Sequence, residues 1–217
     1  MQEKVNLRVD WATHEASKYA CNNWHYSESI PKSKLVKCGV WEDEKFIGVV
    51  IFSYGANALL MSPYNLTMDK GCELTRIALT KHKSSVSQIM SLAIKKLKIF
   101  CPKLELIVSY ADLDQNHLGI IYQATNWIYE GTTMENKHSA YIIKGKKIHN
   151  KTVGDFVNKR GKICNKENIK LLYKTNDVKK FYSKGKHKYL MPLTKYRRKQ
   201  IKHLSKVYPK ANKLGDG

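Results

Sequence analysis

The sequence predicts an α/β protein of the α+β kind, in which helices flank a mixed central sheet and a basic extension follows at the C-terminal end. Three observations lead to this prediction. Short β-branched runs alternate with amphipathic stretches over residues 72–131, two apolar runs before them form a hairpin, and lysines crowd the chain after residue 150. We therefore expect a main domain of residues 1–150 and a basic segment of residues 151–217.

The stretch 72–131 has the order strand, loop, helix, strand, loop, helix and strand. Apolar and polar side chains alternate over residues 74–80, which is typical of a half-buried strand. Apolar residues then recur at helical spacing over residues 86–97, and Pro102 stops that helix. The second half predicts a strand at 104–110, a helix at 119–126 and a strand at 127–129.

The loop at residues 81–85 is a candidate anion site, because it joins a strand to a helix N-terminus. It ends in Ser84 and Ser85, whose hydroxyls can accept the unpaired N–H groups of the helix. Free N–H groups and the helix dipole attract negative charge such as a phosphate, although this loop contains no glycine. A second polar cluster, Asp112 to His117, follows the strand at 104–110, at the edge where open sheets usually place a ligand.

The other elements are expected in chain order as follows. Residues 4–9 form a short strand, Thr13 caps a helix that runs to about Asn22, and residues 23–31 form a loop. Residues 35–41 and 46–52 form the hairpin. Residues 55–70 form a long loop, which is a candidate lid. Residues 139–143 form a last core strand paired with residues 127–129.

Length, composition and cysteine content exclude several classes of protein. The 217 residues are enough for one sizeable core. No apolar run approaches the roughly 18 residues of a membrane span, and the start MQEKVNLRVD has no signal-peptide core. We therefore expect no membrane partner and a cytoplasmic location. The five cysteines are dispersed without a CxxC pair, which favours small buried thiols over disulfides or a zinc ribbon.

Positive charge is the strongest signal in the composition. The chain has 39 Lys and Arg against 18 Asp and Glu, a net charge of +21. Residues 151–217 hold 20 of these basic residues and 4 of the acidic ones. Lysine at this density, interleaved with aromatic residues, attracts a polyanion and is typical of nucleic-acid binding. An AT-rich genome also favours lysine codons, but that bias would act equally on both parts of the chain.

The element order resembles the GNAT acetyltransferase fold, in which a central strand leads the pyrophosphate of acyl-CoA to N–H groups of the next helix. A narrower resemblance rests on four runs: WHYS at 24–27, GVWEDEKFIGVVIFSYGAN at 39–57, CELTRIALTKH at 72–82 and SYADLDQNHLGIIYQATNWIYEG at 109–131. With the basic C-terminal segment, these runs are similar to the bacteriophage Mom family, in order and over most of the chain.

That resemblance implies a phage enzyme, acting in the cytoplasm of the infected bacterium, that modifies the N6 amine of adenine in DNA. The added group would be of the carbamoylmethyl or acetamido type, and it would shield phage DNA from host restriction. The resemblance also implies an acyltransferase-like catalytic domain, acetyl-CoA or a related acyl donor, bound iron, and DNA as the partner. Two alternatives stay open, namely a GNAT N-acetyltransferase acting on another amine and a non-catalytic nucleic-acid-binding protein on the same scaffold.

By motif, the functional residues of the family fall on His25, Tyr26, Arg76, Asp112 and Tyr122. The resemblance to the GNAT fold places the acyl-CoA contacts on Ile77, Leu79, Lys83, Ser84, Ser85, Val86 and Ser87. A set of two histidines and one carboxylate, of the kind that holds iron, would be His25, Asp112 and His117. Trp24, Tyr26, Tyr64 and Trp127 are candidates to sandwich a flipped base.

Each of these side chains also has a purely structural interpretation. Asp112 would form an Asx turn, Tyr122 would pack in the core, and Arg76 would pair with Glu73 or an Asp if it were buried. The N6 amine of adenine is a poor nucleophile because its lone pair is delocalised into the ring, so a base such as Asp112 or His25 is expected. The sequence leaves open the donor, the target sequence and the oligomeric state.

Overall fold

The computed structural model describes residues 5–55, 57–133, 135, 137–143, 145–149 and 178–210. The chain divides into two compact units. The first comprises Met1–Ala111, Leu118–Gly131 and His187–Gly217, and the second comprises Asp112–His117 and Thr132–Lys186. Residues 150–177, which include much of the expected basic segment, lie outside the described residues.

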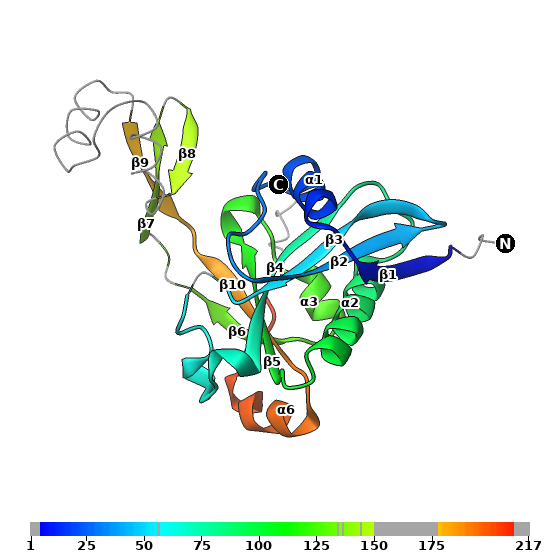
Figure 1. Ribbon diagram of the computed structural model, residues 1–217. Coiled ribbons are helices and arrows are strands. Elements are labelled where there is room, and N and C mark those ends of the chain that lie inside the picture. Colours follow the sequence, from blue (N-terminus) through cyan, green and yellow to red (C-terminus); the bar gives the residue numbers. More distant parts are fainter. Residues whose placement is uncertain are drawn as a thin grey trace, which may run out of the picture. The chain divides into compact units, whose positions relative to one another are not determined.

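A seven-stranded sheet frames the described part of the first unit, in the order β1-β2-β3-β4-β5-β10-β6 (Figure 1). Its strands are β1 (Leu7–Trp11), β2 (Leu35–Glu42), β3 (Lys45–Ser53), β4 (Gly71–Leu79), β5 (Leu106–Asp112), β6 (Ile128–Thr132) and β10 (Lys186–Pro192). Strands β1 to β4 pair antiparallel, whereas β4 and β5 pair parallel. The predicted mixed sheet is therefore confirmed, and β2 and β3 form the predicted hairpin.

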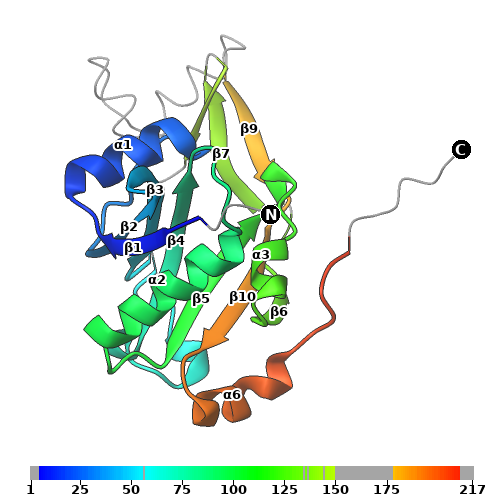
Figure 2. The same ribbon diagram turned by 90° about the vertical axis from the view of Figure 1, so that its right-hand side faces the viewer.

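The alternation of side chains along β3 explains why helices cover both faces of this sheet. Val50 and Phe52 enter the core beneath α2 (Val86–Phe100) and α3 (Ile120–Ala124). Val49 and Ile51 point the other way, into the core beneath α1 (His14–Trp24). The helices consequently lie on opposite faces of the sheet, as the two views show (Figures 1 and 2).

Both long helices begin at hydroxyl caps, as the sequence predicts. Thr13 Oγ1 accepts a hydrogen bond from the backbone N–H of Ala16 at 3.1 Å. Ser85 Oγ accepts one from the backbone N–H of Gln88 at 3.3 Å. Each cap satisfies an N–H that has no acceptor within its own helix. Helix α1 ends at Trp24 and so takes up the first residues of the expected loop.

Two segments cover β5, β10 and β6 on the face opposite α2. One is the loop at 55–70, which contains the short helices η1 (Ser62–Tyr64) and η2 (Met68–Lys70). The other is α6 (Lys195–Ile201), followed by η4 (Lys202–Leu204). Met61, Tyr64 and Ile201 are buried in a shared core with strand residues. The loop is thus anchored by its own apolar side chains.

The expected pairing of residues 127–129 with residues 139–143 is wrong. Strand β6 lies beside β10, whereas β7 (Lys137–Ile143) pairs with β8 (Lys146–His149) and β9 (Val178–Ser183) in the described part of the second unit. The basic segment therefore contributes a strand to the main sheet. Tyr189 and Leu190 of β10 are fully buried there, and the lysines around them hide this short apolar run in the sequence.

An ion pair fastens α6 to the sheet. Arg197, only 8% exposed, donates from Nη2 and Nε to Glu105 Oε2 at 2.7 and 3.1 Å. Its Nη1 donates to the backbone oxygen of Tyr64 at 3.2 Å, which also fixes the end of η1. Charge-assisted bonds of this geometry orient both partners strongly. Among the described residues, no helix is both long and apolar enough to cross a membrane.

We expect Arg197→Ala to lower the free energy of unfolding by about 3 kcal/mol, because it removes the closest charged partner of the partly buried Glu105 carboxylate. Lys199→Ala on the exposed side of the same helix should change it by no more than about 0.5 kcal/mol. Urea unfolding of the two variants measures both values. Equal losses in the two variants would show that the Arg197–Glu105 pair has no special role.

Candidate active site

Strands β4 and β5 part within the sheet, and their facing edges beyond this point are called here the β4–β5 opening. The parallel pairing ends at Leu74 and Ser109, although β4 continues to Leu79 and β5 to Asp112. The register of β3 and β4 shifts at Ile51, close to the same level. Such an irregularity bends a strand and re-aims its side chains. Strands that part in this way leave backbone hydrogen-bonding groups for a ligand.

Ser109 and Tyr122 mark the inner end of the opening. Ser109 Oγ donates to the Tyr122 hydroxyl oxygen at 2.8 Å and lies 2.9 Å from the backbone oxygen of Leu74. Burial raises the pKa of Tyr122 to about 12, against the lowering effect of the Ser109 hydrogen bond. Tyr26, Tyr189 and Glu73 contribute smaller parts of this increase. The Tyr122 hydroxyl is therefore protonated at neutral pH and can donate a hydrogen bond.

Gly119 lets the chain place Tyr122 there. Its φ of +73° lies in the left-handed region, and a Cβ would lie 2.4 Å from Cε2 of Tyr189 and 2.9 Å from Cδ2 of Tyr122. The Tyr122 ring lies 4.9 Å from the rings of both Trp127 and Tyr189. The expected core packing of Tyr122 is thus correct for its ring, while its hydroxyl reaches Ser109 at the opening.

Arg76 joins β4 to the loop that follows α1. Its Nε donates to the backbone oxygen of Ser29 at 3.3 Å, and its Nη1 donates to that of Thr75 at 2.7 Å. Arg76 also acts on the buried thiol of Cys21, whose pKa is raised by burial and lowered in part by this positive charge. The guanidinium thus bonds two carbonyl oxygens, which are uncharged acceptors, and its positive charge can attract an anion.

His25 and Tyr26 lie on the same loop as Ser29. His25 Nδ1 is 2.8 Å from Ser27 Oγ and accepts a hydrogen bond from the Ser27 N–H at 3.1 Å. The His25 and Tyr26 rings stack with centroids 4.3 Å apart. The Tyr26 side chain is half exposed. Arg76 bonds Ser29 of this loop, 47 residues before it in the sequence, and Tyr26 of the same loop lies near enough to Tyr122 to raise its pKa.

Asp112 and His117 belong to the second unit, where they flank η3 (Leu113–Gln115). Asp112 Oδ1 accepts a hydrogen bond from the Asp114 N–H at 3.0 Å. The backbone oxygen of Asp112 accepts one from the His117 N–H at 3.1 Å. The expected Asx turn is confirmed. The other carboxylate oxygen, Oδ2, lies 3.6 Å from Lys186 Nζ.

Asp114 organises the second unit, although the sequence alone does not single it out. Its Oδ1 accepts from the Lys184 N–H at 2.9 Å, and its Oδ2 accepts from Ser183 Oγ at 3.1 Å and Lys147 Nζ at 3.2 Å. Burial by itself would raise the pKa of Asp114, but these bonds bring it below its ordinary value. The partners lie 33 to 70 residues away in sequence, so no local pattern could reveal them.

The residues expected to bind iron do not form a metal site. Within the described parts of the chain, no group of three His, Cys, Asp or Glu side chains is arranged to hold a metal ion. His25 belongs to the first unit, whereas Asp112 and His117 belong to the second, and His25 Nδ1 already accepts the N–H of Ser27.

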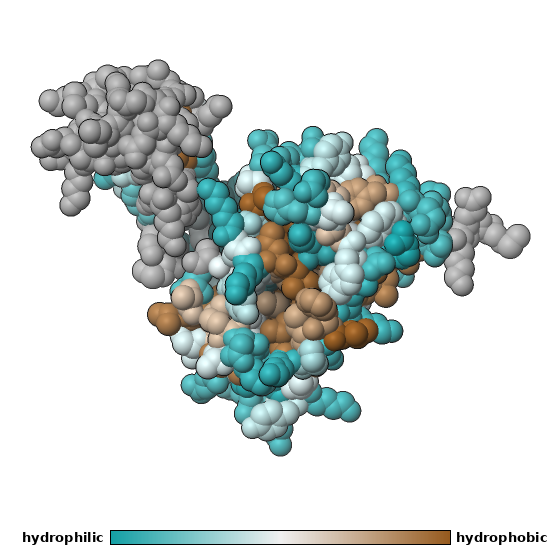
Figure 3. All heavy atoms as spheres, viewed as in Figure 1, coloured by the Kyte–Doolittle hydropathy of each residue, from teal (hydrophilic) through white to brown (hydrophobic). Residues whose placement is uncertain are grey.

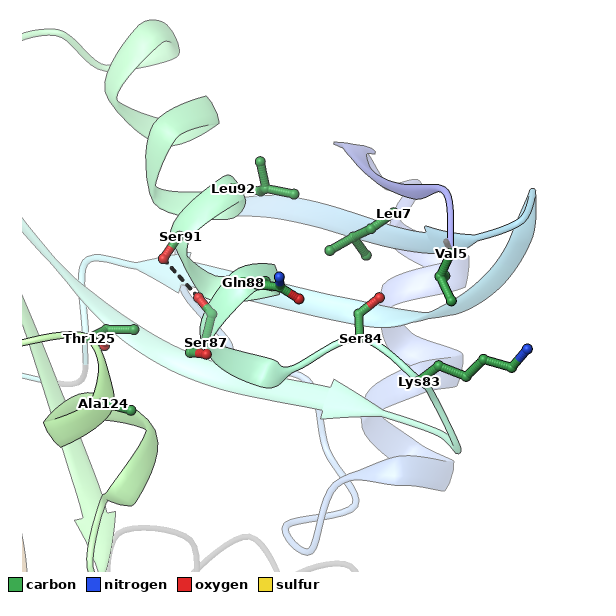
Figure 4. Close-up of a pocket in the computed structure, with 10 residues that line it drawn as sticks. All are labelled: Val5, Leu7, Lys83, Ser84, Ser87, Gln88, Ser91, Leu92, Ala124 and Thr125. Atoms are coloured by element: carbon green, nitrogen blue, oxygen red, sulfur yellow. Dashed lines mark hydrogen bonds between the residues drawn. The ribbon is translucent and has the colours of Figure 1, made fainter. Parts of the chain in front are cut away.

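The positions expected to contact acyl-CoA lie on the end of β4 and the start of α2. Ile77 and Leu79 pack against the main core. Ser85 is the cap of α2, Val86 is its first residue, and Ser87 Oγ lies 3.0 Å from Ser85 Oγ. A cleft of about 940 Å³ lies beside them (Figure 4). Its polar lining consists of Lys83, Ser84, Ser87, Gln88, Ser91 and Thr125.

The backbone N–H groups at the start of this site already have an acceptor, Glu42. The Lys83 N–H lies 3.1 and 3.0 Å from Glu42 Oε1 and Oε2, and the Ser84 N–H lies 2.6 Å from Oε1. Burial of Glu42 would raise its pKa, but hydrogen bonds from Ser84 and Lys83 lower it below the ordinary value. Glu42 is thus an ionised carboxylate at neutral pH. In the sequence it resembles an exposed hairpin residue within Glu42-Asp43-Glu44.

Comparison with solved structures identifies the architecture. A protein from Acinetobacter baylyi, described as an acetyltransferase, aligns with this chain at a TM-score of 0.50 and 10% identity. The alignment covers 89% of this chain and 95% of that one. A spermidine N-acetyltransferase variant from Vibrio cholerae aligns with a TM-score of 0.49 at 11% identity, over 90% and 96% of the two chains. At such low identity a likeness shows the fold alone, and the alignment with the Acinetobacter baylyi protein confirms the predicted GNAT-like fold.

Comparison of sequences identifies the family. The methylcarbamoylase mom of Escherichia phage Mu is 25% identical over 151 residues, which make up 68% of this chain and 61% of that protein. The match thus spans about three fifths of the length of this curated relative. The family model described as the Mom protein family matches residues 6–210, nearly the whole chain. With this match added to the acetyltransferase fold, the chain belongs to the Mom protein family.

Proposed function

We propose that this protein is a phage transferase that modifies the N6 amine of adenine in DNA with a carbamoylmethyl or acetamido-type group. The modification would protect phage DNA from host restriction. Family membership supports this class of reaction, and the phage Mu relative bears the name of a methylcarbamoylase. The observation that carries the proposal is that the loop holding Tyr26 bonds Arg76 through Ser29 and lies near Tyr122, whose hydroxyl reaches Ser109 at the β4–β5 opening.

The chemistry requires a new bond from N6 to carbon, departure of the leaving group of the donor, and loss of a proton from the amine. A neutral Tyr122 hydroxyl is suited to donate a hydrogen bond to oxygen on the transferred group as charge develops there. The Arg76 guanidinium can hold an anionic part of the substrate. Asp112 ends β5, and His25 lies on the α1 loop, so either is a candidate to take the N6 proton.

An enzyme that modifies the N6 amine needs access to it, and a pocket for an unstacked base would give that access. An enzyme that acts on a base inside duplex DNA has to flip it out or use a single strand. Apolar side chains gather in the middle of the face seen in Figure 1, with hydrophilic residues around them (Figure 3). Tyr26 packs on His25 and is 50% exposed, so an unstacked base could contact the exposed part of its ring.

The described surface of α6 and η4 is suited to the phosphate backbone. Arg197 points inward, whereas Lys195, Lys199, Lys202 and Lys206 are exposed. Tyr196 on the same helix is 69% exposed. Lysines on one helix, with an exposed aromatic residue among them, neutralise phosphates and can stack on bases. These residues belong to the segment 151–217 that the sequence marks as basic.

Tyr122→Phe should lower the rate of DNA modification about 100-fold, the usual effect of removing one hydrogen-bond donor to a reacting group. Plasmid DNA from bacteria that express the protein is digested, and mass spectrometry measures deoxyadenosine made heavier by a carbamoylmethyl group. Tyr189→Phe is the matched control, because it removes another buried hydroxyl, which donates to the Leu118 carbonyl. Equal modification by both variants would leave Tyr122 with a packing role.

Asp112→Asn separates chemistry from turn formation. Asparagine keeps an oxygen that can accept the Asp114 N–H, so the turn is retained while the negative charge is lost. We expect folded protein with at least a tenfold loss of modified deoxyadenosine in the same assay, because a neutral amide cannot take up the amine proton. Undiminished modification by this variant would assign the base to another residue, with His25→Gln as the next variant.

Replacing Lys195, Lys199 and Lys202 together by glutamate should weaken binding to duplex DNA and reduce the salt dependence of the affinity. Each lost phosphate contact lowers the slope of log affinity against log salt by about 0.9. The control is reversal of three exposed lysines on other elements, Lys18, Lys95 and Lys103, which changes the net charge equally. If both triple variants lose the same affinity and slope, the effect is one of net charge and α6 is not the contact surface.

A further inference from the structure

We infer that the donor of the transferred group is not an acyl-CoA held by its pyrophosphate, because the Glu42 carboxylate occupies the anion position formed by the loop N–H groups of Lys83 and Ser84, directly before the N-cap of α2. Only the identification of the bound molecule as the donor rests on the proposed function. The occupied anion position itself follows from the hydrogen bonds of three residues, Glu42, Lys83 and Ser84.

Glu42 is held rigidly in this position. It is the last residue of β2 and is paired on both sides, with Leu7 of β1 and Lys45 of β3. The residue is 8% exposed. Both carboxylate oxygens take part in the contact, with Oε1 bonded to the N–H groups of Lys83 and Ser84 and Oε2 to that of Lys83. Pairing with two neighbours fixes the backbone of Glu42, and the hydrogen bonds to Lys83 and Ser84 hold its carboxylate against the loop.

A bound pyrophosphate would compete with Glu42 for the same donors. The N–H groups before a helix are what binds a phosphate at such a site. Here they meet a carboxylate that is ionised at neutral pH. A phosphate could enter only by displacing Glu42, which would lose its hydrogen bonds, or by lying beside it, where two negative charges in a poorly solvated place repel each other.

The adjoining cleft also does not match the charge of coenzyme A. Among the described residues that line it, the cation is Lys83, and Figure 4 shows its side chain directed away from the hydroxyls of Ser87 and Ser91. The other polar groups are neutral hydroxyls and the Gln88 amide. Sites for phosphates are usually built from several cations or many free N–H groups. Neutral hydroxyls and an amide fit a small polar donor that lacks phosphates.

The direct test is binding of coenzyme A to the full chain. Isothermal titration calorimetry measures affinity, and hydrogen exchange with mass spectrometry reports on the backbone amides of residues 81–90. We expect coenzyme A at millimolar concentration to leave exchange at Lys83 and Ser84 unchanged, whether or not it binds elsewhere. Saturable binding that slows exchange at these two residues in the wild type would overturn the inference.

Removal of the carboxylate provides the converse test. Glu42→Ala removes the carboxylate from the anion position. The affinity of this variant for inorganic pyrophosphate and coenzyme A should therefore be at least tenfold higher than that of the wild type. Glu42→Gln keeps the size of the side chain and serves if the alanine variant fails to fold. Glu44→Ala is the matched control on the same hairpin, because Glu44 is exposed and pairs with Arg8 at 2.9 Å. If Glu42→Ala or Glu42→Gln binds no more tightly than Glu44→Ala, the inference is wrong.

These binding measurements are independent of the proposed function. If no modified deoxyadenosine is found in cells, the proposed function fails while the occupied anion position is still tested by titration. If modified deoxyadenosine is found and the wild-type protein also binds coenzyme A at Lys83 and Ser84, the proposed function stands and the inference about the donor fails.

Discussion

The point at which β4 and β5 stop pairing is the constraint on which the rest of the site depends. Their ladder ends at Leu74 and Ser109, and the two strands continue without each other. Ser109 holds this point in place by contacting the Leu74 carbonyl and bonding the Tyr122 hydroxyl. The ring of Tyr122 is buried against Trp127 and Tyr189, so the core itself sets the position of a polar group at the opening.

The loop before α2 shows how one scaffold can serve different chemistry. Free N–H groups at the start of a helix are a general property of helices, and any suitable anion can use them. In this chain the anion is internal, because Glu42 at the end of β2 reaches Lys83 and Ser84. A single side chain on a neighbouring strand can thus change which ligands a fold accepts, without any change in strand order. Fold likeness alone therefore does not identify the donor.

Charged residues in this protein have two separate roles. Some are buried and structural, such as Arg197 with Glu105 in the first unit and Asp114 in the second. Others, such as Lys195 and Lys199 on α6, are exposed and leave a positive surface. On α6 these two roles alternate along one short helix. Anchoring by Arg197 fixes the side of the helix from which the exposed lysines project.

The sequence by itself determined the elements whose signals are local. The hairpin, the caps at Thr13 and Ser85, the helix at 86–97 and the Asx turn at Asp112 all follow from side-chain periodicity and hydroxyl or carboxylate chemistry over a few residues. The motif resemblance correctly indicated the family and its fold. Tertiary structure decided the contacts between distant residues. These include β10 beside β6, Glu42 on the amides of the loop before α2, Tyr122 at Ser109, and the absence of an assembled metal site among the described residues. Such contacts depend on which strands become neighbours, and the energy of that choice is spread over the whole core, so no short run of residues encodes it.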